Sequence, residues 1–222
     1  LAPSFDHAGP MSRTVAGSTA TLKALVPAFE PEPARSVAVG VAWDDRCSPL
    51  VGNRIREAAA LLDAQPVDFP LPPGIGDAFM REVADVHRDL FAESADSYGT
   101  NVRAKIERCL EVTDAEAAEA ADRRSAYRQE AAAALGELDL LLTPTLAFVA
   151  PPLPDDEREI REALIQFTFP FNALGWPALA LPAGPAEHGL PASVQLVGRP
   201  GTDSLVLAIG AELEPSLVRG TA

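Results

Sequence analysis

Apolar residues that recur every three or four positions predict most of the helices in this chain. Thr113 and Glu116 form a capping box, which predicts the start of a long Ala-rich helix that ends near Leu138. The last predicted helix is expected to fray from about Pro215. The apolar stripe of one helix consists of Phe79, Val83, Val86 and Leu90. The other helices are predicted at residues 13–26, 53–62, 100–110, 160–167 and 203–213.

Short apolar segments bounded by Gly and Pro residues predict the strands. Residues 36–43 have valines and Trp43 on one face and small residues on the other, so we expect a strand buried on both sides. This strand, the helix at 53–62 and a strand at 65–69 make a βαβ-like unit. Further strands are predicted at residues 138–142, 178–181 and 193–197. The mixture of strands and helices predicts an α/β layered fold.

Composition and charge narrow the kinds of partner. The 222 residues are 47% hydrophobic and 23% charged, which is ordinary for a globular protein. The formal net charge of −14 argues against binding to nucleic acid and to anionic lipid. No run of about 18 apolar residues exists, and no signal peptide opens the chain. We therefore expect no nucleic-acid or membrane partner and a cytoplasmic location.

Two cysteines, Cys47 and Cys109, are too few for a disulfide framework in a chain of this length. No cysteine or histidine has the spacing of a metal site, and no Gly-rich nucleotide-binding loop is present. We expect two thiols without a disulfide, no metal and no cofactor.

Three segments, taken in their order and spacing, resemble the amidase-signature family. The first is Ser4-Phe5-Asp6-His7-Ala8-Gly9-Pro10, followed by Arg13-Thr14-Val15. The second is Leu141-Leu142-Thr143-Pro144-Thr145. The third runs from Phe169-Pro170-Phe171-Asn172-Ala173-Leu174-Gly175-Trp176 to Gln195-Leu196-Val197-Gly198-Arg199-Pro200. The resemblance extends from Leu1 to about Leu213.

This resemblance implies hydrolysis of a small-molecule carboxylic amide to an acid and ammonia or an amine. The family uses a serine nucleophile, a second serine in a cis peptide bond and a lysine that acts as the base. Burial favours the neutral form of such a lysine, and the amides of a Gly- and Ser-rich loop bind the oxyanion. The resemblance also implies that residues 1–222 are the C-terminal part of one amidase-signature domain. Such a domain has a mixed β-sheet flanked by helices, here with Pro-rich linkers near residues 27–35 and 147–156.

The sequence departs from the family because it contains no Gly-Gly-Ser-Ser-Gly-Gly-Ser type of loop. In the family this loop and the lysine precede the stretch that begins here at Ser4. We therefore expect no catalytic residue in this chain, and a fragment that is inactive alone. Whether it is a truncation, a proteolytic product or a separate gene product stays open, as does a homo-oligomeric state. Two alternatives are a non-catalytic scaffold subunit that completes a catalytic partner and the glutamine-hydrolysing subunit of a tRNA amidotransferase.

Five residues are predicted to line the substrate pocket. The family's Phe-Asn-x-x-Gly segment lies beside the acyl pocket, and Asn172 is either structural or in contact with the ligand. Tyr98, in the variable helical region, is a weaker candidate. The predicted pocket residues are Phe169, Phe171, Asn172, Trp176 and Tyr98.

Other polar residues are expected to have structural or solvated roles. Ser4, Asp6 and His7 are adjacent in sequence, whereas the members of a catalytic triad come from distant positions, so a structural role is expected for them. Gln195 is expected to be a hydrogen-bonded core or edge residue. Solvated positions are expected for Lys23, Lys105, His87 and His188.

Overall fold

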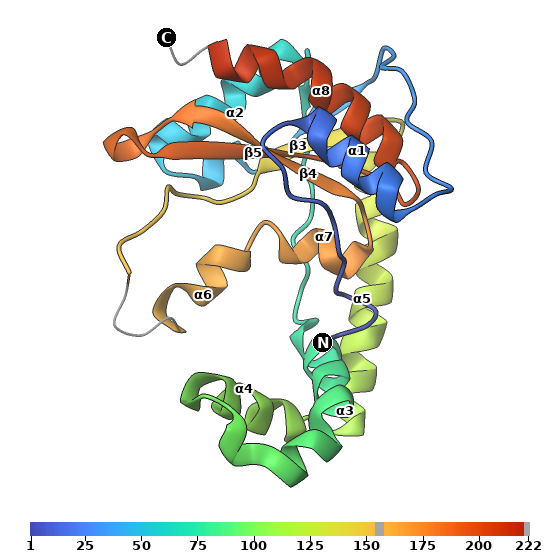
Figure 1. Ribbon diagram of the computed structural model, residues 1–222, viewed down its shortest axis with the longest axis vertical. Coiled ribbons are helices and arrows are strands. Elements are labelled where there is room, and N and C mark those ends of the chain that lie inside the picture. The colour runs from blue at the N-terminus through green and yellow to red at the C-terminus, as the bar shows by residue number, and fades with distance from the viewer. Residues whose placement is uncertain (154–157, 220–222) are drawn as a thin grey trace. The chain divides into compact units, whose positions relative to one another are not determined.

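The computed structural model describes residues 1–153 and 158–219, and its chain divides into two compact units (Figure 1). We call them the helical unit and the sheet unit. The helical unit comprises Leu1–His7, Pro70–Ala132 and Asn172–Gly175. The sheet unit comprises Ala8–Phe69, Ala133–Phe171 and Trp176–Ala222.

The sheet unit contains a five-stranded mixed sheet with the order β2-β1-β3-β5-β4. Strand β1 is parallel to β2 and β3, whereas β5 is antiparallel to both β3 and β4. The sheet confirms the predicted α/β class, and its parallel β1 and β2 confirm the βαβ unit. The strands are β1 (Val39–Val41), β2 (Gln65–Pro66), β3 (Leu140–Pro144), β4 (Ala178–Pro185) and β5 (Pro191–Gly198).

Helices α1 (Val15–Leu25), α2 (Pro49–Leu61) and α8 (Asp203–Arg219) cover one face of this sheet (Figure 1). Leu142 of β3 and Leu196 of β5 are paired in register and both face these helices. Their neighbours Thr143 and Gln195 form the next pair and face the other way, because side chains alternate along a strand. All four side chains are buried, so this part of the sheet is covered on both faces. The residues of β1 are buried as well, as predicted for the strand at residues 36–43.

The helical unit consists mainly of three helices. Helix α3 packs against α4, and α5 begins with the predicted capping box. The Thr113 side chain accepts the Glu116 amide at 3.3 Å, and the Glu116 carboxylate accepts the Thr113 amide at 2.9 Å. The helices are α3 (Gly76–Ser94), α4 (Thr100–Leu110) and α5 (Asp114–Leu135), and α5 continues into the sheet unit.

The helix predicted from the apolar stripe is present as α3, and its stripe is only partly buried. Val83 is buried together with its neighbour Ala84, but Val86 and Leu90 are 51% and 53% exposed. On α3 itself, burial is confined to the side that carries Val83 and Ala84.

Several boundaries differ from the sequence prediction. Helix α2 begins at Pro49, before residue 53, because proline suits the first turn and the Glu187 carboxylate accepts the Leu50 amide at 2.8 Å. The last helix does not fray at Pro215 but continues to Arg219, and Leu217 on its final turns is buried. The short helix α7 (Phe169–Leu174) was not predicted, whereas α6 (Arg158–Ile165) was. Part of the predicted loop at residues 147–156 lies outside the described residues.

None of the described helices is both long enough and apolar enough to cross a membrane.

Candidate functional site

Five aromatic side chains of the sheet unit gather beyond the carboxyl ends of the parallel strands β1 and β2. Trp43 follows β1, and Phe69 follows β2. The indole of Trp43 stacks on Phe167 at 5.2 Å between ring centres and lies 5.7 Å from Phe171. The fifth ring, Trp176, lies 5.8 Å from Phe69. Ligands of open α/β sheets commonly bind beyond this end of the strands, and all five side chains, which we call the aromatic group, are buried there.

Trp43 holds a backbone conformation that is rare for a bulky residue. Its φ is +66° and its ψ is 12°, which is the left-handed region. Its indole Nε1 donates a hydrogen bond of 2.9 Å to the Phe69 carbonyl, and its ring is buried among its aromatic neighbours. Such strain costs roughly 1–3 kcal/mol and persists where the surroundings fix the residue. The sheet unit therefore fixes the turn that follows β1.

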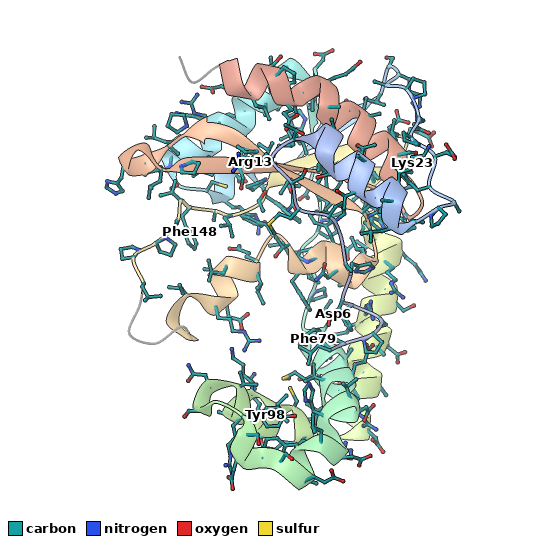
Figure 2. All side chains as sticks on the ribbon, in the orientation of Figure 1. Asp6, Arg13, Lys23, Phe79, Tyr98 and Phe148 are labelled. Atoms are coloured by element: carbon teal, nitrogen blue, oxygen red, sulfur yellow. The ribbon has the colours of Figure 1, made fainter. Side chains whose placement is uncertain are left out.

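The structure separates the predicted pocket residues into different environments. Phe171 and Trp176 are 2% and 8% exposed and belong to the aromatic group. Phe169 is half-buried and Asn172 is exposed, and both lie on α7. Tyr98 lies in the helical unit (Figure 2), where its hydroxyl is 2.9 Å from Nδ1 of His87. The assignment of these residues to a substrate pocket stays a prediction.

Gln195 has the satisfied core role predicted for it. Its amide nitrogen donates to the carbonyls of Pro144 at 3.0 Å and Phe167 at 2.7 Å. Because Phe167 stacks on Trp43, this buried amide links the end of β3 to the aromatic group.

The two lysines do not have the burial that a catalytic base requires. Lys23 projects from α1 (Figure 2) and pairs with Glu30 at 3.2 Å, with both side chains largely exposed. This confirms its predicted solvated position. Lys105 on α4 is half-buried rather than fully solvated.

Ser4, Asp6 and His7 do not form a nucleophile and base. The Ser4 hydroxyl donates to the Glu82 carboxylate and not to His7. Asp6 accepts the Ala2 amide at 2.8 Å, and this bond is the main reason that the pKa of Asp6 is lowered. The three side chains therefore have separate partners, in agreement with the predicted structural role.

The two remaining histidines differ from each other. His188 is exposed, as predicted, but His87 is half-buried against Tyr98 instead of solvated. His87 lies on α3 and Tyr98 lies in the turn before α4, and the centres of their rings are 5.8 Å apart.

The described residues indicate neither metal binding nor thiol chemistry. Over residues 1–153 and 158–219, no group of three or more His, Cys, Asp or Glu side chains could hold a metal ion. Burial first, and then the carboxylates of Asp44 and Asp45, raise the pKa of Cys47 to about 12. This thiol stays protonated at neutral pH and is a poor nucleophile. Cys47 and Cys109, both described, form no disulfide with each other.

Arg124 is a functional candidate that the sequence analysis missed. It lies on α5 in the helical unit and is only 6% exposed. Its Nε donates to the Ala173 carbonyl at 2.8 Å, and its two terminal nitrogens donate to the hydroxyl and the carbonyl of Ser4, each at 2.5 Å. Its position in an Arg-Arg pair of an Ala-rich helix gave no signal of this role, because both bonded segments are distant in sequence.

Comparison with known proteins identifies the family. The amidase family model matches residues 45–207, which is most of the chain, so the chain belongs to the amidase family. A putative amidase, AmiD, from Mycobacterium tuberculosis is 26% identical, and the match covers 95% of this chain and 51% of that protein. A 2-amino-5-chloromuconic acid deaminase from Comamonas testosteroni is 28% identical, with coverage of 100% and 54%.

A solved structure described as an amidase has a similar fold. It superimposes with a TM-score of 0.83 at 31% sequence identity, covering 97% of this chain and 54% of that one. The chain therefore spans about half the length of the curated and solved relatives it matches.

Proposed function

We propose that this chain is the C-terminal part of an amidase that hydrolyses a carboxylic amide to an acid and ammonia or an amine. The observation that carries the proposal is the family match over residues 45–207, which includes strands β2, β3, β4 and β5 and the aromatic group's Phe69, Phe167, Phe171 and Trp176. The match runs through segments of both units, which supports treating residues 1–222 as part of one domain.

We further propose that the chain does not hydrolyse amides by itself. An amide is a poor electrophile, so its hydrolysis needs a nucleophile that a base deprotonates as it attacks. The sequence has no Gly- and Ser-rich loop to carry such a nucleophile, and Lys23 is an exposed, ion-paired residue. In this proposal the serines and the basic lysine come from another segment, on the same or a separate polypeptide.

The first test reads the coding sequence upstream of Leu1 and then compares two proteins. The purified chain and a protein extended by the upstream segment are incubated with simple aliphatic and aromatic amides, and the release of ammonia or amine is measured. We expect turnover only by the extended protein, and its loss when the serine nucleophile of the loop is replaced by Ala. Turnover by the chain alone at the same level would refute the proposal that the chain needs another segment for catalysis. An extended protein that cleaves no amide would refute the amidase assignment.

Helix α7 supplies the side chains best placed to contact the acyl group in this proposal. Asn172 is exposed and Phe169 is half-buried, whereas Phe171 and Trp176 are buried. In the extended protein, Asn172→Ala is expected to raise KM for an amide roughly tenfold through one lost hydrogen bond. Thermal stability should not change, because the side chain is solvent-exposed. An unchanged KM for every amide tested would remove Asn172 from the pocket.

A cytoplasmic location stays a prediction from the sequence.

A further inference from the structure

Arg124 of the helical unit places a charged side chain at a buried position, where apolar side chains are usual. Moving a charge out of water is unfavourable unless the new surroundings supply hydrogen bonds. Burial, with a smaller effect from the neighbouring Arg128, lowers the pKa of Arg124 to about 10, so the group remains charged at neutral pH. Its guanidinium carbon lies 3.6 Å from the centre of the Phe5 ring, which adds a cation–π contact.

The partners of Arg124 come from two segments that are far apart in the sequence. One is the Ser4-Phe5 segment and the other is the end of α7 at Ala173. The planar guanidinium has donors on several sides and can bond both segments at once, which an ammonium group does less well. These contacts all lie within the helical unit.

Ser4 is held from its other side by Glu82 of α3. The Glu82 carboxylate accepts the Ser4 amide at 2.8 Å and also accepts the Ser4 hydroxyl. The adjacent Phe5 ring meets Phe79 edge-on at 5.5 Å between centres. Ser4 thus lies between a buried cation and a carboxylate, and its hydroxyl bonds to both.

We propose that Arg124 is a positioning residue that fixes the backbone at Ser4 relative to the backbone at Ala173. The Ser4-Phe5 segment then cannot move independently of the α7 end that carries Asn172. The inference rests on the proposed function in the form in which the nucleophile loop precedes Ser4 on the same polypeptide and α7 borders the acyl group. Under that function, Arg124 sets the spacing between the attacking serine and the bound amide without touching either.

The first experiment does not depend on amidase activity. Amide hydrogen exchange is measured by NMR on the chain and on Arg124→Met, Arg124→Lys and Ser4→Ala. The matched control is Arg128→Met, one helical turn further along α5, where the arginine side chain is exposed. The reporters are the amides of Phe5 and Asp6, which bond to Ala2, and of Gly175, which bonds to Asn172.

With Arg124→Met we expect these three amides to exchange roughly ten- to a hundredfold faster, because charge-assisted bonds that restrain both segments are lost. Amides of β3 and β5 should keep their rates. Arg124→Lys should restore protection only in part, and Arg128→Met should have no effect. If Arg124→Met does not fold, Ser4→Ala decides, with faster exchange expected at Phe5 and Asp6. Unchanged exchange at the reporters, or a uniform increase throughout the chain, would overturn the proposal.

The second experiment uses the extended, active protein. Arg124→Met is expected to lower kcat about a hundredfold with little change in KM, since a shift of about 1 Å in reacting groups has that effect on the chemical step. A purely structural role would instead reduce the fraction of active protein, which titration of the serine nucleophile measures, and leave kcat per active site unchanged. That result would refute positioning. If the wild-type extended protein has no activity, the proposed function fails, while the exchange experiment still decides whether Arg124 restrains both segments.

Discussion

Gly52 gives the sharpest test of how α2 packs. It lies in the interior of this helix, where replacement of glycine by alanine ordinarily stabilises by roughly 0.5–1 kcal/mol. Here a Cβ atom would lie 2.7 Å from the carbonyl oxygen of Asp44 and 3.3 Å from Nη1 of Arg56. The Arg56 side chain can move, but the Asp44 oxygen is a backbone atom of the turn that directly follows Trp43. We therefore expect Gly52→Ala to reverse the usual sign.

The magnitude follows from two opposing effects. Overpacking a close contact costs typically 1–3 kcal/mol, and the gain in helix propensity offsets up to about 1 kcal/mol of it. The free energy of unfolding should therefore fall by roughly 1–2 kcal/mol, which lowers Tm by about 2–8 °C in a chain of this size.

Urea unfolding followed by far-UV circular dichroism measures this change. The control is Gly76→Ala at the start of α3, where a Cβ atom would meet nothing within 4 Å. This variant should be as stable as the wild type or more stable by up to about 1 kcal/mol. A Gly52→Ala protein at least as stable as the wild type, beside a control that behaves as expected, would refute the contact between α2 and the turn after β1.

Two further predictions concern buried or paired polar groups. The pKa of Asp139 is lowered, first by the hydrogen bond from Arg35 and then by the bond from the Ala38 amide. Its carboxylate therefore stabilises the fold above the unfolded pKa near 3.8. This contribution is lost as the pH falls through the lower folded pKa. Asp139→Asn should therefore lower the free energy of unfolding by about 1 kcal/mol at neutral pH and by less in acid. Urea unfolding of both proteins at neutral and at acidic pH measures this difference. Gln195→Met removes the donor to the Phe167 carbonyl in the core and should lower stability by about 1–3 kcal/mol, measured as a fall in Tm; an unchanged Tm would contradict the buried bond.

The sequence by itself determined the elements whose pattern is local. The helix predicted at residues 100–110 is α4, and the Thr113–Glu116 capping box does begin α5. The βαβ unit from β1 to β2 was also predicted, because strand periodicity, helix periodicity and turn residues are each encoded within a short stretch. The family was recognised for a related reason, since its motifs are contiguous runs of residues.

The tertiary structure decided the features that depend on distant residues. Ser4 and Arg124 are 120 positions apart, so no local pattern could indicate that a charged residue of an Ala-rich helix is buried and bonded to the backbone. The left-handed conformation of Trp43 is likewise imposed by Phe69 and by rings more than a hundred residues further along the chain. Helix α8 also continues past Pro215, although proline disfavours the interior of a helix. Burial of Leu213 and Leu217 maintains the helix there. Local propensity is a weak preference of about 1 kcal/mol per residue, and burial and hydrogen bonding between distant segments override it wherever they are larger.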